Sequence, residues 1–155
     1  MNKTVAEVMS SDPLVVRPET PLKDVIQLLA KNRISGLPVV DAKESLVGVI
    51  SESDLMWQET GVSPPAFVML LDSVIFLQNP ATYERELHKS LGQTAAEVMT
   101  PHPVTIHPDK SVKAAARLMH DRKVPRLIVL DDDKKVVGVI TQGDIIQAMA
   151  AEEAD

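Results

Sequence analysis

The sequence contains no cysteine, and only 3% of its residues are aromatic. Without cysteine the chain cannot form a disulfide, a thiolate zinc site or a cysteine nucleophile. Because aromatic residues are scarce, we expect a core built from Val, Ile, Leu, Met and Ala. The formal net charge is −6, so no surplus of Lys and Arg is available to neutralise the phosphates of a nucleic acid.

The chain also lacks a long apolar run and an apolar signal region near its first residue. Its longest apolar runs, at 67–71 and 74–77, are too short to cross a bilayer. The four histidines show no metal-ligand spacing, and there is no phosphate-binding Gly-x-x-x-x-Gly-Lys loop, Gly-x-Ser-x-Gly or His-Glu-x-x-His motif. These absences predict a cytoplasmic protein that has no metal site, does not act on membranes and is not an enzyme.

What the sequence does contain is a repeat with a period of 90 residues. Thr4–Met9 (TVAEVM) aligns with Thr94–Met99 (TAAEVM), and Val47–Ile50 aligns with the identical Val137–Ile140 (VGVI). No gap is needed anywhere in the alignment. Self-similarity in one register indicates a duplicated structural unit. We therefore divide the chain into a first repeat at 1–57, an insert at 58–93 and a second repeat at 94–155.

Each repeat predicts the same order of elements, namely helix, strand, helix, strand, strand, helix. Capping boxes at Thr4 and Thr94 begin the first helix of each copy. Thr20, with Pro21 at the first helical position, and Ser111 begin the second helix. Runs of apolar and β-branched residues predict the strands. These strands are expected at 14–16, 37–40 and 46–50 in the first copy and at 104–106, 127–130 and 136–140 in the second.

The insert does not have the polar, Gly/Ser-rich composition of a flexible linker. Apolar residues at helical spacing predict one helix over 67–77, and Asn79-Pro80 begins a second helix that ends at Gly92. We interpret the insert as helices that pack on the rim of the repeats or on a second subunit, or that simply cover core. The residues that carry the first of these helices are Phe67, Leu70, Leu71, Val74 and Leu77.

The most informative stretches are the two corners between a strand and a helix, Ser51–Asp54 and Thr141–Asp144. A hydroxyl residue closes the strand, and a carboxylate three positions later lies beside the positive end of the next helix. Such a corner suits an anion, and the carboxylate can also accept hydrogen bonds from two hydroxyl groups. Alternatively, both corners are capping boxes that need no ligand.

In this order and register the motifs resemble the cystathionine-β-synthase (CBS) domain pair, also called the Bateman module. The motifs are ISGLPVVD at 34–41 and GVISESD at 48–54, with VPRLIVLD at 124–131 and GVITQGD at 138–144 as their second copies. The insert resembles that of stand-alone bacterial members. The resemblance implies an α/β fold in which two β-α-β-β-α units, with the helical insert between them, pack sheet to sheet about a pseudo-two-fold axis and leave two related clefts.

The resemblance also implies roles for particular residues. Asp54 and Asp144 match the aspartate that holds the ribose hydroxyls, and Arg126 matches an arginine that contacts phosphate, although Arg126 could instead be a solvated surface residue. Gly143 stands where the first corner has the hydroxyl of Ser53, so the second corner has one hydroxyl fewer. The candidate nucleotide-binding residues are Ser10, Leu14, Ile34, Ser35, Gly36, Ser51, Ser53, Asp54, Thr100, Val104, Val124, Pro125, Arg126, Thr141, Gly143 and Asp144.

By this resemblance we predict a homodimeric regulatory module that binds AMP, ADP or ATP between the repeats. It would require no cofactor, and it would signal to an effector protein of unknown identity. One alternative is a structural or protein-interaction module whose clefts are empty. Another is a sensor of S-adenosylmethionine or NAD. A nucleotide hydrolase is a third alternative, but the sequence offers no base, nucleophile or metal cluster for it.

Overall fold

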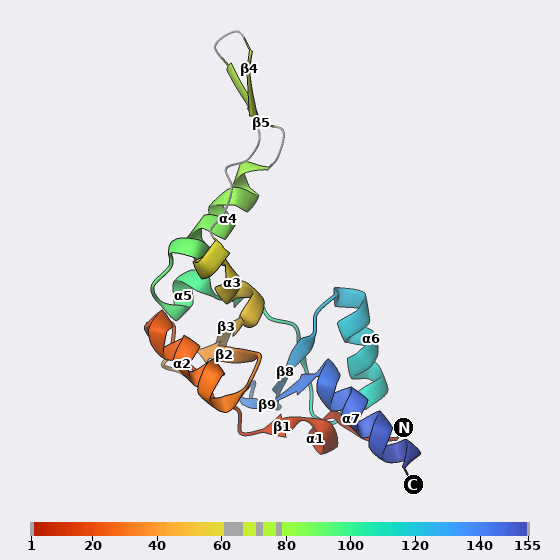
Figure 1. The fold of residues 1–155 in the computed structure, drawn as a ribbon. Helices are drawn as coiled ribbons and strands as arrows, with labels where there is room; N and C mark the ends of the chain where they lie inside the picture. The colour runs from red at the N-terminus through yellow and green to blue at the C-terminus, as the bar shows by residue number, and fades with distance from the viewer. Residues whose placement is uncertain (1, 61–66, 71–72, 77–78, 155) are drawn as a thin grey trace.

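The computed structural model describes residues 2–60, 67–70, 73–76 and 79–154 (Figure 1). Its helices are α1 (Val5–Val8), α2 (Leu22–Asn32), α3 (Glu52–Thr60), α4 (Pro80–Leu91), α5 (Ala95–Val98), α6 (Val112–Arg122) and α7 (Gln142–Glu153). Its strands are β1 (Ser10–Ser11), β2 (Gly36–Val40), β3 (Leu46–Ser51), β4 (Phe67–Leu70), β5 (Ser73–Phe76), β6 (Thr100–Pro101), β7 (Thr105–Ile106), β8 (Arg126–Leu130) and β9 (Val136–Thr141). None of the described helices is long and apolar enough to span a membrane.

The two repeats build two sheets of similar design. One sheet has the order β1-β9-β8-β7, and the other has the order β2-β3-β6. In each, an antiparallel hairpin of β2 and β3 or β8 and β9 forms the centre, and the earlier strand segment of the same repeat runs parallel to it. That segment is β7 in the second repeat and a single bridge between Val16 and Val39 in the first. The predicted β-α-β-β-α unit is therefore present twice.

The N-terminal part of each repeat joins the sheet of the other repeat. β1 pairs antiparallel with β9, and β6 pairs antiparallel with β3. The short helices that precede these strands also pack on the opposite repeat, so Val5 of α1 is buried in the core of the second repeat. Ala95 and Val98 of α5 are buried in the core of the first. Each core is thus completed by the other copy, which the order of elements along the sequence does not reveal.

The glycine of each Val-Gly-Val-Ile strand makes this exchange possible. A Cβ atom at Gly48 would lie 2.5 Å from the sulfur of Met99, and one at Gly138 would collide with the sulfur of Met9. Each methionine therefore packs directly on the strand backbone of the other repeat, where its flexible thioether fills the space that the glycine leaves.

The two cores contain aliphatic side chains and methionine, as the composition predicts. On α2 the buried residues are Leu22, Val25 and Leu29, at the spacing of one helical face. Ile26 also fits the apolar spacing of this helix, but it is 44% exposed. On α6 the buried residues are Val112, Ala115 and Met119, which occupy the same three positions of the repeat.

The backbone conformation of the two repeats matches as closely as their buried side chains do. The non-glycine residues with positive φ fall into pairs 90 positions apart, and they mark the end of α2 and α6, the hairpin turns and the segment after β1 and β6. Such conformations are uncommon outside glycine, so their recurrence shows that both copies follow one path. The pairs are Asp12 with His102, Arg33 with Lys123, and Glu44 with Lys134.

The predicted helix starts are largely present, with one shift. The hydroxyl of Ser111 accepts a hydrogen bond from the N–H of Ala114 at 3.0 Å, which confirms it as the N-cap of α6. The corresponding prediction for Thr20 is wrong by one position, because Pro21 is the N-cap of α2. The hydroxyl of Thr20 instead accepts from the N–H of Arg17 at 2.9 Å and stabilises the turn before the helix.

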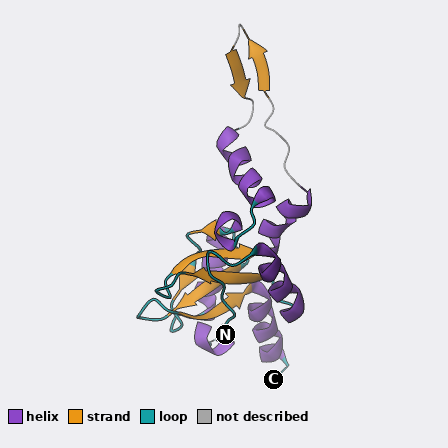
Figure 2. Ribbon diagram, turned by 90° about the vertical axis from the view of Figure 1, so that its left-hand side faces the viewer, coloured by secondary structure: helices purple, strands orange, loops and turns teal. Residues whose placement is uncertain are grey.

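The insert is where the structure differs most from the sequence prediction. Instead of a helix over 67–77, β4 and β5 form an antiparallel pair in which Phe67 lies opposite Phe76; Leu71 and Leu77 lie outside the described residues. Short apolar runs rich in Val, Ile and Phe suit a strand as well as a helix, and spacing alone does not separate the two. The second helix is confirmed as α4, which packs against α3. Figures 1 and 2 show β4 and β5 projecting beyond α3 and α4.

Candidate functional site

The corner at the end of β9 holds Asp144 in a defined orientation. The N–H of Thr141 donates to Oδ2 of Asp144 at 2.9 Å, and the N–H of Asp144 donates to the hydroxyl of Thr141 at 3.1 Å. This reciprocal capping box begins α7 where the strand ends. The two capping bonds therefore use only one carboxylate oxygen of Asp144, and they set the direction in which the other points.

The corresponding corner at the end of β3 is closed by an additional contact. Oδ2 of Asp54 accepts from the N–H of Ser51 at 2.9 Å and from its hydroxyl at 3.2 Å. Oδ1 of Asp54 accepts from the hydroxyl of Thr100, a residue of the exchanged β6, at 3.0 Å. Asp54 is only 7% exposed, so both of its oxygens are bonded inside the protein. The two corners, equal in sequence pattern, are therefore unequal in structure.

A cavity of about 530 Å³ lies at the Asp144 corner and draws on both repeats. The second repeat contributes Arg126 from the start of β8, together with Thr141 and Asp144. The first repeat contributes residues in and after β1 and the segment that joins α2 to β2. The volume of the cavity is typical of a site for a small molecule. The candidate residues that line the cavity are Ser10, Leu14, Ile34, Ser35, Gly36, Arg126, Thr141 and Asp144, joined by Pro13, Asn32, Arg33, Leu37, Glu52 and Val139.

Arg126 is the most unusual charged group in this cavity. It is half-buried, its Nη2 donates to the hydroxyl of Ser35 at 3.2 Å, and its Nε is buried without a hydrogen-bond partner among the described residues. Burial lowers the pKa of the Arg126 guanidinium, whereas the carboxylates of Glu52 and Asp54 act in the opposite direction. A Cβ at Gly36 would lie 3.1 Å from Nε, so a larger residue there would require Arg126 to shift by a few tenths of an ångström. A desolvated guanidinium with an unused donor is suited to a bound anion.

Sequence reasoning missed two charged residues of the cavity lining. Arg33 is exposed, but it also lines the cavity at the left-handed C-cap of α2. Glu52 stands at the start of α3, where its N–H donates to the carbonyl of Ser35 at 3.0 Å. Arg33 directly precedes the motif that begins at Ile34, and Glu52 lies within the corner Ser51–Asp54, so these positions were the available signal. The charged side chains of the lining are thus two guanidinium groups and two carboxylates.

The remaining candidate residues do not line this cavity. Val104 and Val124 pack against the core of the second repeat, and the carbonyl of Pro125 accepts a hydrogen bond from the N–H that begins α7. Ser53 and Gly143 are exposed in the first turns of α3 and α7. Among the described residues, no group of His, Asp and Glu side chains could hold a metal ion.

Comparison with known proteins identifies relatives along nearly the whole chain. The CBS domain family model matches residues 5–58 and 95–151. The chloroplastic CBS domain-containing protein CBSX1 of Arabidopsis thaliana is 33% identical over 151 residues, which cover 94% of this chain and 63% of CBSX1. The protein MJ1426 of Methanocaldococcus jannaschii is 33% identical over 144 residues, 88% of this chain and 86% of that one. This chain thus spans less than two thirds of CBSX1.

Solved structures show the same fold. The crystal structure of CBSX2 of Arabidopsis thaliana in complex with AMP has a TM-score of 0.72 and 28% sequence identity to this chain. The similarity covers 97% of this chain and 98% of the CBSX2 chain. The fold of this chain therefore belongs to a known architecture.

Proposed function

The chain belongs to the CBS domain family, and on this premise we propose that it is a regulatory module that binds an adenine nucleotide of the AMP, ADP or ATP class at the Asp144 corner. The observation that carries the proposal is the cavity of about 530 Å³, in which candidate residues from both repeats meet. The AMP complex of CBSX2, a relative of similar fold, supports the choice of ligand class.

The side chains of the cavity suit the parts of a nucleotide. Asp144 would accept hydrogen bonds from the ribose hydroxyls through Oδ1, because the capping bond uses Oδ2. Leu14, which is 43% exposed, and Ile34 would contact the faces of the base. Arg126 would contact phosphate, together with the N–H of Gly143, because the N–H groups of Gln142 and Asp144 already donate to Pro125 and Thr141.

We place the principal site at Asp144 rather than at Asp54. A ribose at Asp54 would have to displace the hydroxyl of Thr100 from a buried carboxylate. At Asp144 the position equivalent to Thr100 is Ser10, which lines the cavity and leaves room for a ligand hydroxyl. Gly143 removes one hydroxyl from this corner, so its own backbone N–H and Arg126 would provide the contacts to phosphate.

Calorimetric titration of the wild-type chain with AMP, ADP, ATP, S-adenosylmethionine and NADH tests this proposal. We expect an adenine nucleotide to bind and Asp144→Ala to weaken that binding at least about tenfold, which corresponds to about 1.4 kcal/mol. Ser53→Ala is the matched control, because Ser53 is an exposed corner residue that does not line the cavity. The affinity of this variant for the nucleotide should equal that of the wild type.

Other results would favour the alternatives. Selective binding of S-adenosylmethionine or NADH would change the ligand class but keep the site. If no ligand binds with a dissociation constant below about 1 mM, which is only about −4 kcal/mol, the sensor proposal fails. The chain would then be a structural or protein-interaction module whose corners serve as helix caps.

The same cavity suggests how binding would be transmitted. Because the lining comes from both repeats, a nucleotide that binds one relative arrangement of the repeats more tightly would shift the population toward it. We further propose that a homodimer in the cytoplasm passes this change to an effector protein and catalyses no reaction itself. The repeats at 1–57 and 94–155 and the insert at 58–93 remain our proposed division of the chain.

A further inference from the structure

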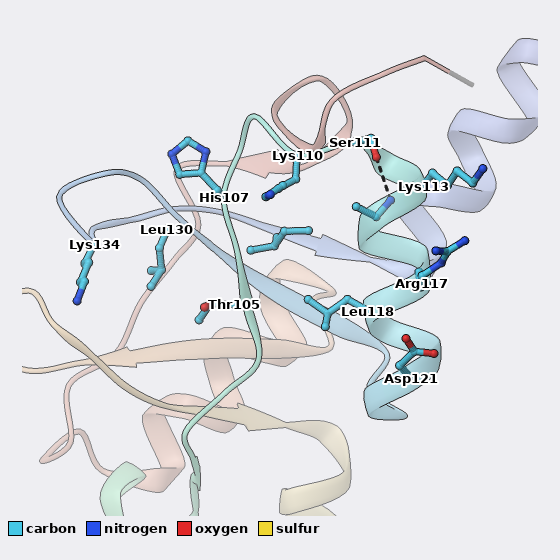
Figure 3. Close-up of a pocket in the computed structure, with 12 residues that line it drawn as sticks. Thr105, His107, Lys110, Ser111, Lys113, Arg117, Leu118, Asp121, Leu130 and Lys134 are labelled. Carbon is cyan, nitrogen blue, oxygen red and sulfur yellow. Dashed lines mark hydrogen bonds between the residues drawn. The ribbon is translucent and has the colours of Figure 1, made fainter.

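A second and larger cavity lies on the outer side of the second repeat, away from the Asp144 corner. It has a volume of about 1000 Å³ and lies between α6 on one side and β7 and the turn between β8 and β9 on the other (Figure 3). We call it the α6 groove. Its apolar lining is formed by Ile106, Ala114, Leu118 and Leu130. β7 is the edge strand of its sheet, and Thr105 on it is exposed.

The polar lining of the α6 groove is strongly positive. It contains the cations Lys110, Lys113, Arg117 and Lys134 and a single carboxylate, that of Asp121. Within the part of the chain that the structure describes, none of these four cations takes part in an ion pair. The whole chain has a net charge of −6, so this local surplus of positive charge runs against the overall balance.

The first repeat provides an internal comparison, because the positions 90 residues earlier follow the same backbone path. Arg117 and Lys134 correspond there to Gln27 and Glu44. Arg17, the counterpart of His107, donates to the carbonyl of Asp41 and pairs with Glu44 at 2.5 Å. In the first repeat Glu44 thus pairs with the cation at this position, whereas in the second repeat His107 pairs with Asp132 at 2.8 Å and Lys134 has no ion-pair partner among the described residues.

The arrangement of the cations indicates the size of the partner. In Figure 3, Lys113 and Arg117 point outward from α6, whereas Lys134 lies across the groove on the hairpin. A compact anion at the bottom of the groove would not reach all of them. A longer segment that lies along α6 can place apolar side chains on the lining and carboxylates against the rim. An edge strand beside the groove favours an extended segment, since alternate side chains then face opposite sides.

From this geometry we propose that the α6 groove is a docking site for an extended acidic segment of a partner protein, in which apolar and acidic residues alternate. The groove shares no residue with the nucleotide cavity, so the proposal stands or falls independently of nucleotide binding.

The test is an NMR titration of the full ¹⁵N-labelled chain with a short blocked peptide in which glutamate alternates with leucine. We expect amide shifts on α6, β7 and the turn at 131–135, and none on α2 and the turn at 41–45. The double variant Arg117→Gln with Lys134→Glu carries the residues of the first repeat and should weaken peptide binding about tenfold. Lys113→Glu should weaken it as well, whereas Lys23→Glu, at the matched position of α2, should leave it unchanged. Added salt should weaken binding by screening.

Four results would overturn the proposal. The first is no peptide binding, and the second is equal shifts in both repeats. The third is a glutamine–leucine peptide that binds as tightly as the glutamate peptide, because charge would then play no part. Inorganic tripolyphosphate serves as the small-anion probe; if it binds the same residues more tightly than the peptide, the groove is a small-anion site and the docking proposal is wrong.

Discussion

At the scale of single residues, the duplicated corners show that one sequence pattern can support two different states. Both aspartates cap a helix, but Asp54 is buried and also bonded to Thr100, whereas Asp144 lines a cavity. Capping and ligand binding are not exclusive alternatives for Asp144, because the capping bonds involve one carboxylate oxygen. At Asp54 the capping function dominates, because the remaining oxygen stabilises the contact between the repeats.

This difference predicts unequal losses of stability. Asp54→Ala removes the cap of α3 and leaves the hydroxyl of Thr100 without its carboxylate, so we expect the free energy of unfolding to fall by about 2–3 kcal/mol. Asp144→Ala removes only a cap and should cost about 1 kcal/mol. Urea denaturation of both variants measures the two values, and equal losses would contradict the structural difference between the corners.

At the scale of elements, α1 and β1 of the first repeat pack on the second repeat, and α5 and β6 of the second pack on the first. This exchange couples the two repeats. Val5 has no exposed surface and lies in the core of the second repeat, although it belongs to the first repeat in the sequence. The methionines that follow α1 and α5 pack on glycines of the opposite sheet. A ligand that contacts β1 therefore contacts an element of one repeat that is held by the sheet of the other.

Amide hydrogen exchange can test whether α1 and α5 pack on the opposite repeat. Val5→Ala should lower stability by about 1–2 kcal/mol and should speed amide exchange in β8 and β9 more than in β2 and β3. Val98→Ala is the matched variant in α5, and its effect should be stronger in β2 and β3. If each substitution instead loosened the sheet of its own repeat, the short helices would not be exchanged in solution.

At the scale of the whole molecule, large apolar side chains remain exposed on the long helices. Ile26 on α2 is 44% exposed, Met56 on α3 is 56% exposed, and Ile146 and Met149 on α7 are 62% and 50% exposed. Apolar area of this kind commonly marks a protein interface. It supports the proposed homodimer, in which helices of two chains would cover one another.

Light scattering at micromolar concentration checks this proposal. We expect the wild-type chain to have the mass of a dimer, and the double variant Ile146→Glu with Met149→Glu to have that of a monomer, because carboxylates at the interface would be desolvated. Gln147→Glu, on the same helix, adds charge without removing apolar area and should remain dimeric. A monomeric wild-type chain would contradict the homodimer.

The sequence by itself determined the features that depend on local pattern and on the repeat. These include the duplicated unit, the order of its elements, most helix starts, and the candidate residues at the corners, of which Thr141 and Asp144 line the cavity. Hydrophobic periodicity and capping residues act over a few positions, so they can be interpreted without knowledge of the fold. The insert shows the limit of this reasoning, because short apolar runs such as the one at Phe67 fit a strand as well as a helix.

Only the tertiary structure decided which contacts cross between the repeats. The shared pattern of a hydroxyl residue and an aspartate three positions later gave no indication that Asp54 would be buried against Thr100 while Asp144 would line a cavity beside Arg126. The exchange of α1 with α5 and the unequal charge of the two outer faces are likewise invisible in a single repeat. The physical reason is that burial, desolvation and charge balance depend on neighbours that are distant in sequence, and folding alone brings them together.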